Sequence, residues 1–544
     1  MMKRIFFLLL VWTFSAVSFE TSAQTSELLP FFKSFLDRDL TNVKFPLPNQ
    51  PAASGSSKGS YKRTNRATLL PGVGLRLTEG KEEIGAFFLP NYVFSTLDGL
   101  LIEFEYIMMY TSSTDQGITD GICMFLVDAT TNAYIGDNLK YGAEGAGFGY
   151  THRASVSTTI FPVSGMKGGY LAVALDQGYF KSWRFDDYEM RNGISYDDGP
   201  NEIANSQPEK YATRSNVTIR GAAGRGLKTI VTRDNTHEIP EGSWGFPMLI
   251  TRHTGWDIDN GLEDENTPGL RNEAGFRLNT SNGRFEQYVI PRIDKPFNIA
   301  GGSMFTRSDE STYRKAIIAL EPNLNGGGFN ITVTIQHGSE KTVVIEDYTY
   351  PSSLTYTENG VPIRVAPGKY PTPVPYLNPP TTDLTLATPK QLVIGFMAST
   401  GQLTAHTNII KNLRITPLYG AISEDDTYIH RRGPATVRPL DNDKAYRDGG
   451  SKPTASRDNL DPESFRFWED EEHCVGDRVL EHVTDQGKWV YDPERAEVLF
   501  FPIKGFTGEA SIMYDVKGKY SPYSAEKYRS SLAKIIINIA DNQP

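Results

Sequence analysis

The sequence predicts an all-β protein, and three observations support this. The chain of 544 residues contains 49 glycines and 33 prolines, which favour turns. It also contains 27 tyrosines and 29 phenylalanines, which favour strands. Apolar and polar residues alternate over 329–336, as in a strand with one buried face, and no segment has the spacing of an amphipathic helix. Short strands joined by many turns are typical of β-sandwiches.

The beginning of the chain has the layout of an export signal. Lys3 and Arg4 precede the apolar segment 5–12, and small residues follow at 21–23. The apolar part is too short to span a bilayer, so we predict a signal peptide at 1–23. Later runs are not apolar enough to form a transmembrane segment, and the signal is not followed by a cysteine that could carry a lipid. We expect a protein that is secreted or held at the cell surface.

The composition excludes one class of partner. The formal net charge of -10 makes nucleic acid a poor partner, because phosphates favour basic surfaces. The alternative interpretation of this net charge is that it only keeps the protein soluble. We expect the two cysteines, Cys123 and Cys474, to lie in different domains and therefore not to form a disulfide.

Residues 119–176 are the most informative part of the chain. The apolar runs 121–128 and 169–175 are typical of buried strands, and they flank a glycine-rich turn at 145–149. Asp120 precedes the first run and Asp176 ends the second. An Asp-Gly pair holds a carboxylate beside backbone that can approach a ligand closely. The alternative is that Asp120 is only a turn residue before a strand and that Asp176 only caps the end of one.

Other segments complete a long β-domain. Residues 315–320 and 329–335 form a predicted hairpin around the turn 323–328. The polar segment 185–240 is predicted as a long insertion, and 350–383 as irregular chain. Further strands are predicted at 74–78, 101–106, 216–221, 244–249, 392–401 and 408–415.

These motifs, in this order, resemble the L-type (legume-lectin-like) domain found in surface proteins of Bacteroidetes-type bacteria. The resemblance covers Leu69 to Pro417 and implies a concanavalin A-like jelly-roll sandwich. It implies that Asp120 binds sugar hydroxyls and that Gly147, or its neighbours Gly145 and Gly149, donates a backbone N–H to the same sugar.

The same resemblance implies a stacking residue and a metal. Tyr179, Phe180 and Trp183 lie in the loop that carries a sugar-stacking aromatic residue in the family. Asp176 and Asp186 correspond to acids of a calcium site, and Ca²⁺ is therefore an expected cofactor. The sequence departs from the family at Phe180, which stands where the family has an asparagine.

The last part of the chain differs in its motifs. It contains a Leu-Asp-Asn-Asp opening at 440–443, a strand centred on Trp489, a Gly-Phe-Thr-Gly turn at 505–508 and a terminal strand at 534–539. These motifs resemble the cadherin-like or fibril-repeat β-sandwich of bacterial adhesins. We therefore predict a lectin-like domain at 24–418 and an adhesin-type domain at 419–544.

The motifs favour binding over catalysis. The Glu-x-Asp-x-x-Glu strand motif of jelly-roll glycosidases and the His-Glu-x-x-His zinc motif do not occur. We predict a non-catalytic carbohydrate-binding adhesion protein whose partner is a glycan or a glycoprotein. One alternative is a structural or adhesive protein with a degenerate sugar site that binds protein. Another is a polysaccharide hydrolase with an unrecognised pair of carboxylates.

Overall fold

The structure is a computed structural model. It describes residues 25–26, 29–48, 64–110, 120–152, 164–177, 215–231, 236–239, 241–242, 244–255, 274–281, 284–289, 293, 295–302, 310–357, 381–400, 405–431, 433–449, 453–470 and 473–540. Within these residues, the helical elements are five 3-10 turns of three residues each, and all other elements are strands. The predicted all-β class is confirmed. The predicted signal peptide at 1–23 lies outside the described residues.

The larger unit contains a sheet of ten strands, which we call the front sheet. Its strands are antiparallel except for one short parallel pair at the edge. In order they are β1 (Thr25–Ser26), β7 (Tyr92–Ser95), β23 (Gln391–Ser399), β9 (Gly121–Asp128), β11 (Gly169–Asp176), β12 (Asn216–Arg220), β15 (Met248–His253), β16 (Ala274–Asn279) and β17 (Arg284–Val289), with β6 (Ile84–Phe88) beside β23.

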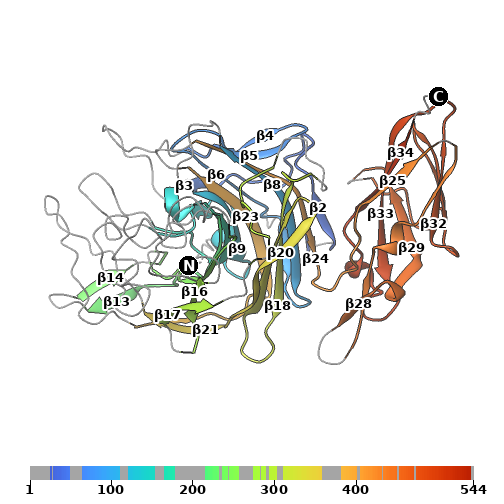
Figure 1. The fold of residues 1–544 in the computed structure, drawn as a ribbon. Helices are drawn as coiled ribbons and strands as arrows, with labels where there is room; N and C mark the ends of the chain where they lie inside the picture. Colours follow the sequence, from blue (N-terminus) through green and yellow to red (C-terminus); the bar gives the residue numbers. More distant parts are fainter. Residues whose placement is uncertain are drawn as a thin grey trace, which may run out of the picture.

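A second antiparallel sheet of eight strands, the back sheet, packs against the front sheet (Figure 1). The predicted hairpin 315–335 is confirmed here, with Ile318 opposite Val333. In order the strands are β20 (Glu340–Tyr350), β19 (Phe329–His337), β18 (Arg314–Pro322), β8 (Leu100–Tyr110), β24 (His406–Thr416), β5 (Gly74–Thr78) and β4 (Thr68–Leu70), with β2 (Phe31–Lys33) beside β24. The larger unit is a jelly-roll sandwich.

The front sheet is buried on both faces. Leu171, Val173 and Leu175 of β11 belong to the core between the two sheets. Their neighbours Ala172 and Ala174 point to the other face, into a second apolar cluster formed with the connecting segments. This arrangement explains why the sequence of β11 is apolar throughout rather than alternating.

Shorter elements complete the larger unit. The 3-10 turns η1 (Asn132–Tyr134) and η2 (Gly145–Gly147) lie between β9 and β11. Three two-stranded pairs are formed by β3 (Leu47–Pro48) with β10 (Lys140–Tyr141), β13 (Lys228–Val231) with β14 (Thr236–Ile239), and β21 (Ser353–Thr357) with β22 (Thr381–Thr385).

Two predictions of local structure were wrong. The strand expected at 244–249 begins only at Met248, because the chain turns at Gly245 and Phe246, whose φ angles are 90° and 59°. The segment 350–383 was expected to be irregular, but both of its ends are strands of the β21–β22 pair. Thr and Tyr in these short strands favour β-structure, but the prolines between them favoured irregular chain more strongly in the sequence.

The second unit contains two sheets of four strands each, around one apolar cluster. The first sheet consists of β25 (Asp426–His430), β34 (Ala533–Ile539), β33 (Gly508–Gly518) and β29 (Leu460–Trp468). The other consists of β26 (Ala435–Val437), β32 (Glu497–Pro502), β31 (Gly487–Asp492) and β30 (Glu481–Val483). The pair β27 (Ala445–Arg447) and β28 (Thr454–Ser456) and the turns η3 (Pro439–Asp441), η4 (Arg457–Asn459) and η5 (Glu526–Tyr528) connect them.

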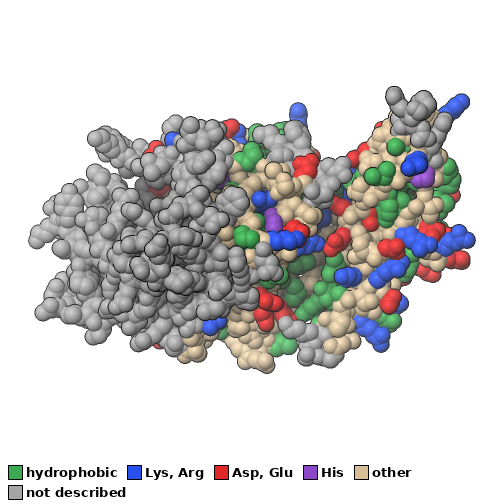
Figure 2. Space-filling view, viewed as in Figure 1, with side chains coloured by type: hydrophobic (Ala, Val, Ile, Leu, Met, Phe, Trp, Pro, Cys, Tyr) green, Lys and Arg blue, Asp and Glu red, His purple; other side chains and the backbone are tan. Residues whose placement is uncertain are grey.

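Polar contacts join the two units. Asp98 of the larger unit accepts hydrogen bonds from Lys527 (2.7 Å) and Tyr528 (2.9 Å), and Tyr419 donates to Glu321 (2.7 Å). Figure 1 shows the second unit, in orange and red, alongside the back sheet, and Figure 2 shows a hollowed boundary between the two units. The domain boundary near residue 418 stays a prediction, which unfolding experiments can test.

Candidate functional site

Neighbouring strands of the front sheet carry polar residues at the same end. The Cα partners across the sheet are Ser399 and Gly121, Gly121 and Asp176, Asp176 and Asn216, and Asn216 and His253. Residues that are partners across a sheet project from the same face. We call Ser399, Asp176, Asn216 and His253 the polar row.

The polar row lies on the face of the front sheet that points away from the back sheet. Asp176 follows Leu175, which faces the core between the sheets, so its side chain takes the opposite direction. All four side chains are buried. The ring of His253 accepts the N–H of Gly255 at Nδ1 (3.1 Å), so a neutral ring carries its proton on Nε2.

Asp120 lies beside this row. It directly precedes β9, and its carbonyl accepts the N–H of Gln177 (2.7 Å), the residue that follows Asp176. Its side chain is buried, with 4% of its surface exposed. Gly121 has a φ of 132°, and a Cβ there would lie 2.1 Å from the carbonyl oxygen of Leu175. The glycine of the Asp-Gly pair is therefore required for the close approach of β11.

The glycine-rich turn reaches the same place. The N–H of Gly145, in η2, donates to the Oγ of Ser399 (2.7 Å), which links the turn to the polar row. Gly147 accepts the N–H groups of Tyr150 (2.9 Å) and Thr151 (3.1 Å) through its carbonyl. The structure thus brings Asp120, Asp176 and the turn to one end of the front sheet. Their roles as sugar and metal ligands remain predictions.

A buried arginine supplies positive charge on this face. Thr218 donates from Oγ1 to Oδ2 of Asp176 (3.1 Å). Arg220, two residues further along β12, is also buried and donates from its guanidinium to the carbonyl of Phe246 (2.9 Å). Burial lowers the pKa of Arg220 to about 10, and the negative charge of Asp176 opposes this shift. Asp176 and Arg220 therefore compensate each other's charge.

The oxygen groups at this end of the front sheet can be compared with the ligands that a calcium ion requires. A calcium ion takes six to eight oxygen ligands, among them carboxylates. At this end of the sheet lie the carboxylates of Asp120 and Asp176, with the buried Glu144 beside the glycine-rich turn, and Arg220 provides a positive charge that interacts with Asp176. Among the described residues there is no group of three or more His, Cys, Asp and Glu side chains that could hold a metal. These residues alone do not fit a calcium site.

Several predicted site residues cannot be placed. Tyr179, Phe180, Trp183 and Asp186 lie outside the described residues. Other residues of the site were not predicted. Asn216, His253, Ser399 and Arg220 come from three strands that are far apart in the sequence, and a polar residue at the end of an apolar strand was the only local signal.

Comparisons with known proteins give distant structural similarity only. No family model matches the chain, and no curated protein matches it significantly. Similar solved structures include the metal-free form of lectin I-B4 from Griffonia simplicifolia, with 10% identity and a TM-score of 0.30 over 71% of this chain and 98% of that one. Peanut lectin with a 9mer peptide has 11% identity and a TM-score of 0.32 over 72% and 97%.

A further structure of this kind is the exoplasmic/lumenal domain of VIP36 in a form bound to Ca²⁺ and Man3GlcNAc. It has 10% identity and a TM-score of 0.28 over 71% of this chain and 90% of that one. Identity and TM-score at this level do not define the function of this chain, and the fold follows from its own two sheets. Among the described residues, no helix is long and apolar enough to cross a membrane.

Proposed function

We propose that the protein binds carbohydrate at the end of the front sheet, with Asp120 as the principal hydrogen-bonding group. The observation that supports this proposal is the position of Asp120 beside Asp176, Asn216 and the turn at 145–149. A carboxylate can accept two sugar hydroxyls at once, and such charge-assisted hydrogen bonds are stronger than neutral ones. Amide, hydroxyl and imidazole groups nearby offer both donors and acceptors.

The finer parts of the proposal come from the sequence resemblance. In these, Gly147 donates its N–H to the sugar, and one of Tyr179, Phe180 and Trp183 stacks against its C–H face. The protein is exported and acts in adhesion without catalysis. Calcium at Asp176 and Asp186 is a further part of this resemblance; Asp186 lies outside the described residues, and the proposed binding of sugar by Asp120 does not depend on the ion.

The burial of Asp120 determines how the proposal should be tested. Alanine at this position would remove a buried polar group and so affect stability as well as binding. Asp120→Asn keeps the shape and removes the charge. Asp128→Asn is a matched control, because Asp128 is a buried aspartate at the opposite end of the same strand.

The experiment is a glycan array on the parent chain, followed by affinity measurements for each glycan that binds. Loss of a hydrogen bond to a charged group costs about 1.5–3 kcal/mol, so Asp120→Asn should weaken binding by about tenfold to a hundredfold. Asp128→Asn should leave affinity unchanged. Equal affinities for the parent and Asp120→Asn would exclude Asp120 as the anchor. Release of reducing ends from a bound polysaccharide would instead indicate a hydrolase.

A further inference from the structure

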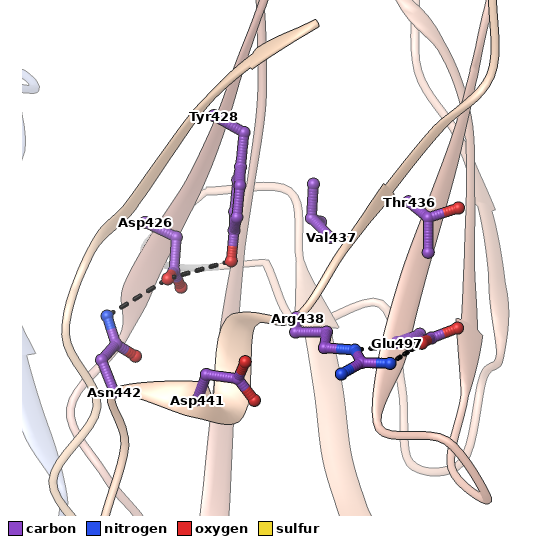
Figure 3. A pocket seen from close by; sticks show the side chains of 8 residues that line it. All are labelled: Asp426, Tyr428, Thr436, Val437, Arg438, Asp441, Asn442 and Glu497. Carbon is purple, nitrogen blue, oxygen red and sulfur yellow. Dashed lines mark hydrogen bonds and ion pairs between the residues drawn. The ribbon is translucent and has the colours of Figure 1, made fainter.

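The second unit contains a pocket at the edge of its sandwich. It lies between the edge strand β25 of one sheet and the segment from β26 to η3 next to the other, as Figure 3 shows. Its volume is about 590 Å³, within the range of small-molecule sites. The lining residues are Asp426, Tyr428, Thr436, Val437, Arg438, Asp441, Asn442 and Glu497.

A buried carboxyl group lies in this pocket and is fixed by neutral groups. Oδ1 of Asp426 accepts hydrogen bonds from Asn442 (3.1 Å) and from the hydroxyl of Tyr428 (3.2 Å). Oδ2 accepts the hydroxyl of Tyr514 (3.2 Å), and the same hydroxyl lies closer to Oδ2 of Asp443 (2.9 Å). Three hydrogen-bond donors therefore fix the position of the Asp426 carboxyl in the pocket wall.

The charges of the other lining residues are already compensated. Arg438 donates two hydrogen bonds to Glu497, at 3.0 and 2.7 Å, and Arg457 forms an ion pair with Asp441 (2.5 Å). Figure 2 shows acidic and basic side chains interspersed over the visible face of this unit. The pocket therefore has no large excess of charge to attract an ion.

The polar groups of the pocket are planar and can form several hydrogen bonds each. Carboxylate, amide and guanidinium groups stand beside the half-buried ring of Tyr428 and the buried side chain of Val437. Sugars offer hydroxyl groups in pairs and an apolar C–H face, and these match planar polar groups and an aromatic ring. We propose that this pocket is a second binding site, specific for a neutral, hydroxyl-rich ligand such as a saccharide unit.

A cationic ligand fits this pocket less well. Burial, and next the charge of Asp443, raise the pKa of Asp426 to about 8, so that this carboxyl is largely protonated near neutral pH. A protonated carboxyl can donate as well as accept, as sugar recognition requires. Among the described residues there is no group of three acidic, His or Cys side chains that could hold a metal here. The ligand is therefore expected to be uncharged.

The test uses the full chain with Asp120→Asn, which weakens the proposed front-sheet site. The probe is an array of neutral, sulfated and amine-bearing glycans, with affinities measured for each glycan that binds. Tyr428→Ala should weaken binding of neutral glycans by about tenfold or more, since it removes the aromatic face. Ile429→Ala is the matched control, because Ile429 is the next residue of β25 and is 82% exposed.

The outcomes separate the two sites. Retained binding by Asp120→Asn that is lost in the double variant with Tyr428→Ala supports the second site, even if the front-sheet site does not exist. If Tyr428→Ala fails to fold, Asn442→Ala takes its place, because Asn442 is exposed. No binding to neutral glycans by Asp120→Asn, or equal binding by the Tyr428 and Ile429 variants, overturns the proposal. Binding restricted to amine-bearing or sulfated probes also overturns it.

Discussion

The two units hold buried aspartates in opposite ways. Asp176 of the front sheet is fully buried, and its charge acts on the buried guanidinium of Arg220, which lies on the neighbouring strand. Asp426 of the second unit is 8% exposed, and its neighbours are two tyrosine hydroxyls, the Asn442 amide and a second carboxyl, Asp443. Burial, and next the charge of Asp443, raise the pKa of Asp426 and favour its neutral form, whereas Asp176 faces a buried positive charge. The electrostatic setting differs although both units are β-sandwiches.

The cores of the two units also differ. The front sheet of the larger unit is covered on both faces, and all eight residues of β11 are buried. In the second unit β31 and β34 alternate between buried and partly exposed positions, because only one face of each sheet is covered. The second unit therefore depends on a single apolar cluster, in which one large side chain should matter more.

The largest effect is expected from Trp489→Ala. Trp489 of β31 is fully buried and lies 4.3 Å from the ring of Phe500. Removing such a side chain costs about 3–5 kcal/mol, so the second unit should unfold at a much lower temperature while the larger unit is unaffected. Calorimetry with two resolved transitions measures this, with the exposed Leu324 as an alanine control. A single transition that shifts as a whole would contradict a domain boundary near residue 418.

The stability of the second unit should also depend on pH, with a smaller effect than that of Trp489→Ala. Burial raises the pKa of Asp443 to about 7, and burial with the charge of Asp443 raises that of Asp426 to about 8. Both values lie above those of the unfolded chain, so the folded state binds more protons between about pH 4 and pH 8. The stability of the second unit should therefore be highest near pH 4 and decrease as the pH rises to 8.

The variant Asp443→Asn tests the direction of this pH dependence of stability. Each unit of pKa difference corresponds to about 1.4 kcal/mol, so the shift of the Asp443 pKa from 3.8 to about 7 corresponds to on the order of 4 kcal/mol. Asp443→Asn should stabilise the second unit at pH 8, change little at pH 4 and flatten the profile. Urea unfolding at a series of pH values measures it. Stability that rises with pH in the parent would show that the pair is ionised and compensated by another group.

Calcium is expected to have the smallest effect on stability, and this effect should concern the larger unit. A ligand that binds only the folded state at ten times its dissociation constant adds about 1.4 kcal/mol. If Asp176 binds calcium as the sequence resemblance implies, millimolar calcium should raise only the transition of the larger unit. Asp176→Asn should abolish the shift. No shift in the parent would leave Arg220 as the counter-charge of Asp176 and would separate this chain from calcium-dependent lectins.

The sequence by itself determined the elements and their burial. The apolar runs 121–128 and 169–175 became strands buried on both faces, and the alternating segment 329–336 became one strand of a hairpin with one covered face. These features depend on the local order of residue types, which a single sequence displays directly. The all-β class follows from the same local information.

Only the tertiary structure decided which side chains meet. Asn216 and His253 lie beside Asp176 because β11, β12 and β15 pair in one register, and no local pattern specifies that register. Tyr514 meets Asp443 and Asp426 although they are 71 and 88 residues away along the chain. Cross-strand contacts join residues that are distant in the sequence, so the charge and protonation of both sites are properties of the folded chain alone.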